Sequence, residues 1–217
     1  MAPAIFSIAN GINEAKLKKQ SVEIEAVNRE LRANGRSLTV LHSIEMNLNP
    51  LGEGDMEPAA LRSLDIVLGS FHSALRRKDD QTERYLAALR NPHIQILGHP
   101  RGRIYNYRSG LSADWETVFH EATRLGKGME IDAYPDRQDL NLSLLKIAKR
   151  CGTRVSMGTD AHHPWQLEFI DLALAAALVA KISPERIVNF MPLKELRAWV
   201  EKVRGAEVRR THTKTKR

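Results

Sequence analysis

The sequence predicts an α/β fold built around a parallel β-sheet. Short apolar segments alternate along the chain with longer stretches in which apolar residues recur at helical spacing. Five of the short segments are predicted strands, and each interval between them is long enough for a crossover helix. With 217 residues, 42% of them hydrophobic, the chain can form one substantial core. We therefore expect one α/β domain over residues 1–205.

The first predicted element is an amphipathic surface helix over Ile12–Leu31, which Gly35 ends. The predicted strands follow in this order: Ser37–Met46, Asp65–Phe71, His93–Leu97, Gly128–Ala133 and Thr153–Gly158. Cap and stop residues mark the helices, as at Asp80 and Gly126. These helices are Asp80–Arg90, Asp114–Leu125, Leu140–Arg150, a short one that starts at Ser183–Pro184, and Leu193–Val203.

Composition restricts the setting of the protein. The sole cysteine, Cys151, excludes an internal disulfide, and no secretory leader is visible, so we expect a cytoplasmic protein. No apolar run approaches the roughly 20 residues of a membrane span. The net charge of +7 favours a polyanionic partner, although part of the excess falls in residues 206–217, which are predicted to be a disordered basic tail.

Polar side chains stand where the predicted strands end. The candidates for a functional site are Glu45, His72, His99, Asp160 and His162. In parallel α/β folds the carboxyl ends of all strands meet at one edge of the sheet, where functional residues gather. A single histidine at a strand end is more often structural than a ligand, so the prediction depends on the whole set.

Imidazole and carboxylate together suit zinc, manganese or iron better than magnesium or calcium. A Glu/His/His set leaves one position open for water, and a pair of metals can hold both oxygens of a phosphoryl displacement. We therefore predict one or two divalent ions and hydrolysis of a phosphate ester. The catalytic and metal-binding candidates are the same five residues.

Three arginines are candidates for binding the phosphate. Arg101 and Arg103 follow His99 closely, and Arg137 is a weaker candidate; each could instead pair with a carboxylate. His42 is left out because strand alternation turns it away from Glu45. The sequence contains no phosphate-binding glycine loop, no Cys-His cluster and no serine nucleophile elbow, which argues against the corresponding classes of protein.

The motifs resemble those of the polymerase and histidinol phosphatase (PHP) superfamily, above all the C-terminal PHP domain of bacterial and archaeal family X DNA polymerases. The matching strings are Ile8-Ala-Asn-Gly-Ile12, Ser43-Ile-Glu45, Leu64-Asp-Ile-Val-Leu-Gly-Ser-Phe-His72, Ile96-Leu-Gly-His-Pro-Arg-Gly-Arg103, Glu130-Ile-Asp-Ala-Tyr-Pro-Asp-Arg-Gln-Asp-Leu140 and Gly158-Thr-Asp-Ala-His162. They extend over most of the chain.

The resemblance implies a distorted TIM-like barrel of seven parallel strands that binds up to three metals. It assigns Glu45, His72 and His99 to one metal, Asp160 to a second that Glu45 bridges, and His162 to a third. The His-x-His and Thr-Asp-His motifs of the first two family strands are absent, so the resemblance implies an incomplete, N-terminally truncated barrel. Family members usually have Glu-Ile-Asn and Pro-Thr-Gly-Arg where this chain has Glu130–Asp132 and Pro100–Arg103.

Two functions follow as alternatives. The first is a metal-dependent phosphoesterase acting on DNA 3′ ends, as an exonuclease, or on a small phosphate monoester. The second is a degenerate PHP remnant that binds metal or a partner without turnover. The missing strands would leave two parallel edges unpaired, so we also expect a second copy or a separate N-terminal fragment to complete the barrel.

Overall fold

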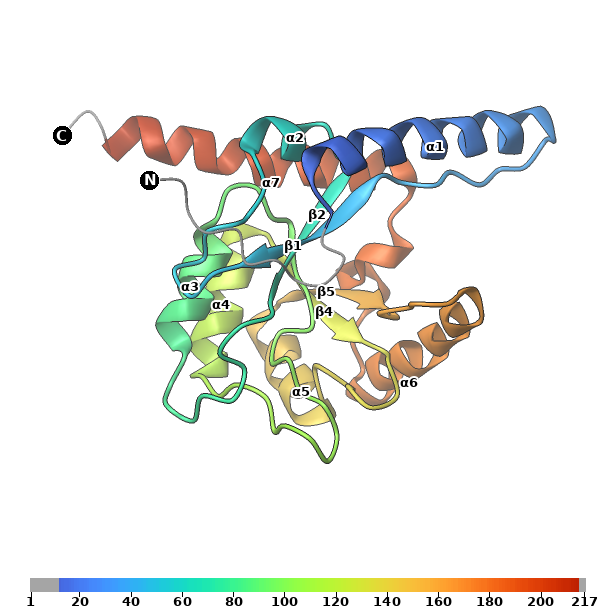
Figure 1. Ribbon diagram of the computed structural model, residues 1–217. Coiled ribbons are helices and arrows are strands. Elements are labelled where there is room, and N and C mark those ends of the chain that lie inside the picture. The colour runs from blue at the N-terminus through green and yellow to red at the C-terminus, as the bar shows by residue number, and fades with distance from the viewer. Residues whose placement is uncertain (1–11, 215–217) are drawn as a thin grey trace.

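The computed structural model describes residues 12–214, and their side chains as far as residue 205 (Figure 1). The elements, in chain order, are α1 (Glu14–Ala33), β1 (Ser43–Leu48), α2 (Pro58–Arg62), β2 (Ile66–Phe71), α3 (Thr82–Arg90), β3 (Ile96–Leu97), α4 (Trp115–Leu125), β4 (Gly128–Asp132), α5 (Leu142–Cys151), β5 (Arg154–Gly158), the 3-10 helix η1 (Pro164–Phe169), α6 (Ile170–Ala180), the 3-10 helices η2 (Pro184–Arg186) and η3 (Val188–Phe190), and α7 (Leu193–Lys214).

The five strands form one parallel sheet in the order β1-β2-β3-β4-β5. The register places Glu45 of β1 beside Leu68 of β2, and Glu130 of β4 beside Ser156 of β5. All strands run the same way, so their carboxyl ends lie at one edge of the sheet. The prediction of an α/β fold with a parallel sheet is confirmed.

The two faces of the sheet are covered differently. The larger core joins one face, which includes Met46, Val67 and Met129, to residues of α3, α4, α5 and α6. On the other face a smaller core packs Ile66 and Ile96 against α7. Figure 1 shows α3, α4 and α5 grouped on one side of the strands and α7 at the top of the view. The polar strand ends lie on the same face as the smaller core, farther along the strands.

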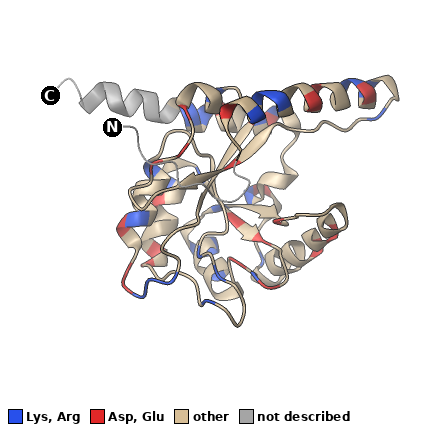
Figure 2. Cartoon of the chain, in the orientation of Figure 1, with Lys and Arg blue, Asp and Glu red and all other residues tan. Residues whose placement is uncertain are grey.

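The terminal helices differ in how far the sequence anticipated them. Asn13 caps the N-terminus of α1, because its side chain accepts a hydrogen bond from the Lys16 amide at 3.0 Å. The buried residue of α1 is Leu17. Figure 2 shows cationic and anionic residues interspersed along α1, as expected for a solvated helix. α7 continues to Lys214, into the segment for which a disordered tail is predicted. Residues 215–217 and the side chains from 206 lie outside the described part, so that tail stays a prediction.

The described strands do not close into a barrel. β1 and β5 are the outer strands of the sheet and are not paired with each other, so the arrangement is consistent with a TIM-like fold without confirming a barrel. The expectation that both edges are unpaired is wrong for β5. Val155 forms a parallel bridge with Ile187, and the Asn189 side chain accepts from the Met157 amide at 2.7 Å and donates to the Met157 carbonyl at 2.9 Å.

An amide side chain can occupy this edge because it carries both an N–H donor group and a carbonyl acceptor, as a peptide unit does. Completion of the sheet by a second copy or an N-terminal fragment therefore stays a prediction that concerns β1. Among the helices that the structure describes, none has the length and apolar character that crossing a bilayer requires.

We predict that Asn189→Ala lowers the free energy of unfolding by about 1–2 kcal/mol, because two hydrogen bonds to the β5 edge are lost together. Urea denaturation measures the change, with Lys194→Ala on an exposed position of α7 as the control. Equal stability of the Asn189→Ala and wild-type proteins would show that this edge does not depend on the side chain.

Candidate metal centre

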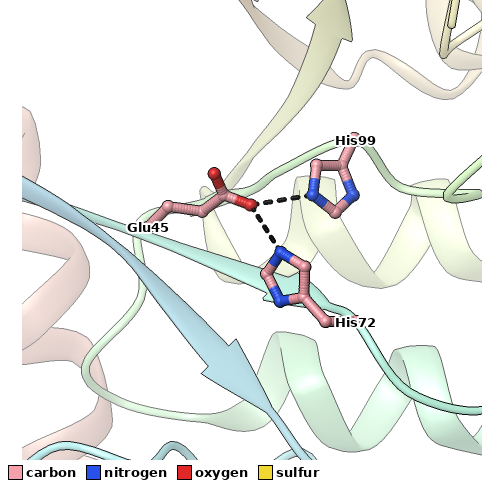
Figure 3. Close-up of side chains that lie close together, drawn as sticks. All are labelled: Glu45, His72 and His99. Carbon is pink, nitrogen blue, oxygen red and sulfur yellow. Dashed lines mark hydrogen bonds and ion pairs between the residues drawn. The ribbon is translucent and has the colours of Figure 1, made fainter. Parts of the chain in front are cut away.

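Glu45, His72 and His99 come together at the carboxyl edge of the sheet. Glu45 lies on β1, His72 directly follows β2, and His99 lies two residues beyond β3. The Oε1 atom of Glu45 is 2.7 Å from Nε2 of His99 and 3.1 Å from Nε2 of His72 (Figure 3). One oxygen and two nitrogens therefore converge on one point, although the three residues are far apart in the sequence.

Interactions between Glu45 and the two histidines shift the pKa values of Glu45 and His99. Partial burial alone would raise the pKa of Glu45, but hydrogen bonds and positive charge from His72 and His99 outweigh it and lower that pKa far below its usual value. His99 is only 6% exposed. Burial acts to lower the pKa of His99, but Glu45, with further help from Glu130 and Asp139, raises it to about 9.

The group fits a divalent metal. A histidine that binds a metal through Nε2 usually donates its Nδ1 proton to a nearby oxygen, which fixes the tautomer. Asn47 provides that oxygen for His72, with Oδ1 at 3.2 Å from Nδ1. Within the described residues, the donor atoms of Glu45, His72 and His99 lie within 4.8 Å of one another, close enough for one ion. A carboxylate with two imidazoles is a donor set typical of zinc and related ions.

Backbone geometry places His99 in this group. Its φ angle is 23°, in a region that residues other than glycine rarely adopt, and its amide donates to Oε2 of Glu130 at 2.6 Å. Glu130 is held close to the chain: a Cβ atom at Gly158 would collide with its carboxylate, and one at Gly98 would collide with the Ser70 hydroxyl. Glycines at both positions leave room for Glu130 beside the site.

Three further carboxyl groups, those of Glu130, Asp132 and Asp139, lie near His99. Burial, above all, raises the pKa of Glu130 to about 7 and that of Asp132 to about 8, and the negative charges of neighbouring carboxylates add to both shifts. Asp139 is also buried, and its pKa is raised for the same first reason. The described residues thus place several acidic side chains next to His99, where a bound cation would offset their mutual repulsion.

Asp160 and His162 lie on the loop after β5. They are not part of the three-donor group within the described residues. Asp160 has a φ angle of 49° and pairs with Arg137, Oδ2 to Nη2 at 3.2 Å. His162 is 74% exposed at its side chain, and its Nδ1 lies 2.7 Å from the Asp160 carbonyl oxygen. Their assignment as ligands stays a prediction.

The three predicted phosphate-binding arginines have different surroundings. Arg101 donates to the carbonyls of Ser109 and Leu111, and Arg103 donates to the Arg137 carbonyl at 2.7 Å. Backbone carbonyls of nearby loops therefore hold the side chains of Arg101 and Arg103, whereas the Arg137 side chain pairs with Asp160.

A groove with a volume of about 620 Å³ is lined by residues of two loops. It is formed by the loop after His72 and the loop after His99, so it begins a few residues from two of the candidate ligands. Its lining includes five cations and two tyrosines: Arg76, Lys78, Arg101, Arg103, Arg108, Tyr105 and Tyr107. Both tyrosines are more than 60% exposed, at 64% and 62%, and the Arg76 guanidinium lies 4.4 Å from the centre of the Tyr107 ring.

Three residues that support the site were not predicted from the sequence. Asn47 stands two positions after Glu45, so strand alternation would have placed it on the same face. Glu130 belongs to a string that carries the family resemblance, but its hydrogen bond with the His99 amide was not predicted. Gln166 fixes the loop after β5, because its Oε1 accepts from the amides of His162 and His163 at 2.6 and 2.9 Å. No sequence signal singles out Gln166.

We predict that His72→Ala loses most of the bound metal. Asn47→Leu should still bind metal, with an affinity about 10–100-fold lower, because Asn47 does not bind the ion but orients the His72 ring that does. His93→Ala, a histidine outside the group, serves as the control. Elemental analysis and a metal titration read out both effects. Metal content that is equal in wild type and His72→Ala would remove His72 from the centre.

Comparison with known proteins gives relatives of two kinds. The chain is 30% identical over 198 residues to DNA polymerase/3′-5′ exonuclease PolX of Bacillus subtilis (strain 168). The aligned region covers 91% of this chain and 34% of that protein. The chain is 28% identical over 161 residues to a probable phosphatase of Thermoanaerobacter sp. (strain X514), covering 69% of this chain and 63% of the relative. A probable phosphatase of Photobacterium profundum is 33% identical over 135 residues, 58% of this chain and 52% of that protein.

The chain thus spans about a third of the polymerase and less than two thirds of these phosphatases. No family model matches it. The two kinds of relative, a family X polymerase and several probable phosphatases, bear out the resemblance of this chain to the polymerase and histidinol phosphatase superfamily.

Proposed function

We propose that this chain is a phosphoesterase that depends on a divalent metal, zinc, manganese or iron. The observation that carries the proposal is the convergence of Glu45 Oε1, His72 Nε2 and His99 Nε2 at the carboxyl edge of the sheet. Relatives named as phosphatases and as a polymerase/exonuclease support the same class of reaction.

Each residue of the centre has a part in the proposal. Glu45, His72 and His99 hold the metal, which when bound polarises the phosphoryl group and activates water. Asn47 orients His72, and Glu130 holds the backbone of His99. Asp160 and His162 would hold a second ion on the loop after β5. Arg137 lies beside Asp160, where its guanidinium could pass to a phosphate oxygen of the substrate.

The groove favours a nucleic acid strand over a small monoester. Arg101, Arg103 and Arg108 donate to backbone carbonyls rather than to carboxylates, so these hydrogen bonds leave their charge available to a polyanion. Exposed Tyr105 and Tyr107 provide faces on which bases can stack. We therefore propose hydrolysis at the end of a single strand that lies along the groove, with the scissile phosphate at the metal.

One observation favours the alternative of a metal-binding remnant without turnover. Asp160 pairs with Arg137, and the described residues at this edge offer a single group of three close donors. A site that holds one metal and lacks a second would bind the phosphate but hydrolyse it slowly. An activity measurement separates the two alternatives.

We predict metal-dependent phosphodiesterase activity on a single-stranded oligonucleotide, lost on treatment with a chelator and restored by manganese or zinc. Glu45→Gln is expected to lower kcat/KM at least about 100-fold, since the metal provides several kcal/mol of transition-state stabilisation. Glu53→Gln, on an exposed position beyond β1, is the control. Folded, metal-loaded protein without any turnover would favour the remnant.

The groove gives a separate prediction. The double variant Arg76→Ala/Lys78→Ala should make the negative slope of log K against log salt for a single strand less steep by about 1.4, roughly 0.7 for each phosphate that is no longer neutralised. Arg77→Ala is a matched control, because Arg77 pairs with Asp79 and does not line the groove. An unchanged slope in the double variant, measured by fluorescence anisotropy, would place the strand elsewhere.

A further inference from the structure

Three potential metal ligands meet on the outer helical layer, away from the centre described above. Glu116 and His120 lie one turn apart on α4, and Cys151 is the last residue of α5. Both helices pack on the face of the sheet opposite to Glu45. The donor atoms of the three residues lie within 4.8 Å of one another. They share no residue with the first group.

Helix geometry produces this arrangement. Residues four apart on a helix project from the same face, so Glu116 and His120 both face α5. Cys151 is 7% exposed, whereas Glu116 and His120 are exposed at the surface. Zinc–ligand bonds of about 2.0–2.3 Å in a tetrahedron place donors about 3.5 Å apart. Because two of the three side chains are free to rotate at the surface, small rotations bring the set to that spacing.

The surrounding charge is favourable for a cation. Cys151 lies at the C-terminal end of α5, where the helix carries partial negative charge. Asp114 and Glu116 add negative charge near the thiol, and Arg150 opposes it. Burial, above all, and these carboxylates raise the pKa of the Cys151 thiol, so without an ion the thiol keeps its proton. Binding of a metal would release that proton to solvent.

We propose that Glu116, His120 and Cys151 form a second metal site that links α4 to α5. A thiolate, an imidazole and a carboxylate are a mixed donor set that selects zinc over magnesium or calcium, with water as the fourth ligand. The site does not depend on the phosphoesterase function. Its consequence is structural: an ion that binds only the folded chain raises the free energy of unfolding in proportion to the logarithm of its concentration.

Cobalt(II) tests the proposal directly, because a thiolate bound to cobalt gives an intense charge-transfer absorption in the near ultraviolet. Cys151 is the sole cysteine of the chain, so any such band must come from this site. We expect the band in the full-length protein to saturate at one equivalent and to disappear when zinc is added. Cys151→Ser should abolish it, and His120→Ala should weaken cobalt binding about tenfold or more, since one of three ligands is lost.

His72→Ala and His93→Ala serve as controls that should keep the band, which separates this site from the first. Circular dichroism checks that each variant is folded; if Cys151→Ser does not fold, the exposed His120→Ala and Glu116→Gln variants carry the test. Absence of the band in folded wild-type protein at millimolar cobalt would overturn the proposal. A band of unchanged affinity in the double variant Glu116→Gln/His120→Ala would also overturn it.

Discussion

The parallel hydrogen bonding of five strands is the constraint on which the rest of this structure depends. Because the strands run in one direction, residues that end different strands are brought to the same edge, however far apart they stand in the sequence. The register then decides which of them meet. Glu45 lies one strand from β2, which His72 follows, and two strands from β3, which leads to His99. One carboxylate oxygen is thereby placed between two imidazole nitrogens.

Buried acidic side chains lie near His99, and the loops after His72 and His99 form a groove lined by cations. This arrangement fits the proposed chemistry. Acidic residues gather around His99, where burial makes their ionisation unfavourable unless a cation is present. The loops that carry His72 and His99 continue into a groove whose guanidinium groups are held by backbone carbonyls. A metal ion would bind among the carboxylates, and the phosphates of a strand would bind along the cations. The same loops therefore serve both the proposed metal and the proposed substrate.

The sequence predicted the strands β2, β4 and β5, and helices α3, α4 and α5, because each had clear periodicity and a cap or a stop. It missed α6, which has apolar residues around much of its surface and so lacks the contrast between faces that marks a surface helix. Strand ends predicted that Glu45, His72 and His99 would lie at one edge together with Asp160 and His162, and the family resemblance assigned the first three to one metal. Within the described residues the three come together, and Asp160 and His162 stay outside their group. The side-chain directions of Arg101 and Arg103 were not, because they depend on how the loop returns at Ser109 and on the Arg137 carbonyl. The hydrogen bond of Asn189 to the edge of β5 likewise depends on a contact between residues far apart in the sequence.

We propose that one divalent ion binds between Glu45, His72 and His99. Anomalous diffraction from a crystal grown with manganese or zinc, with data recorded on either side of the metal absorption edge, tests it most directly. We expect an anomalous peak within bonding distance of Glu45 Oε1 and of Nε2 of both histidines, and these atoms would then coordinate the ion instead of one another. A well-ordered site without an anomalous peak, in which Glu45 Oε1 still forms hydrogen bonds with both histidines, would contradict the proposed metal centre.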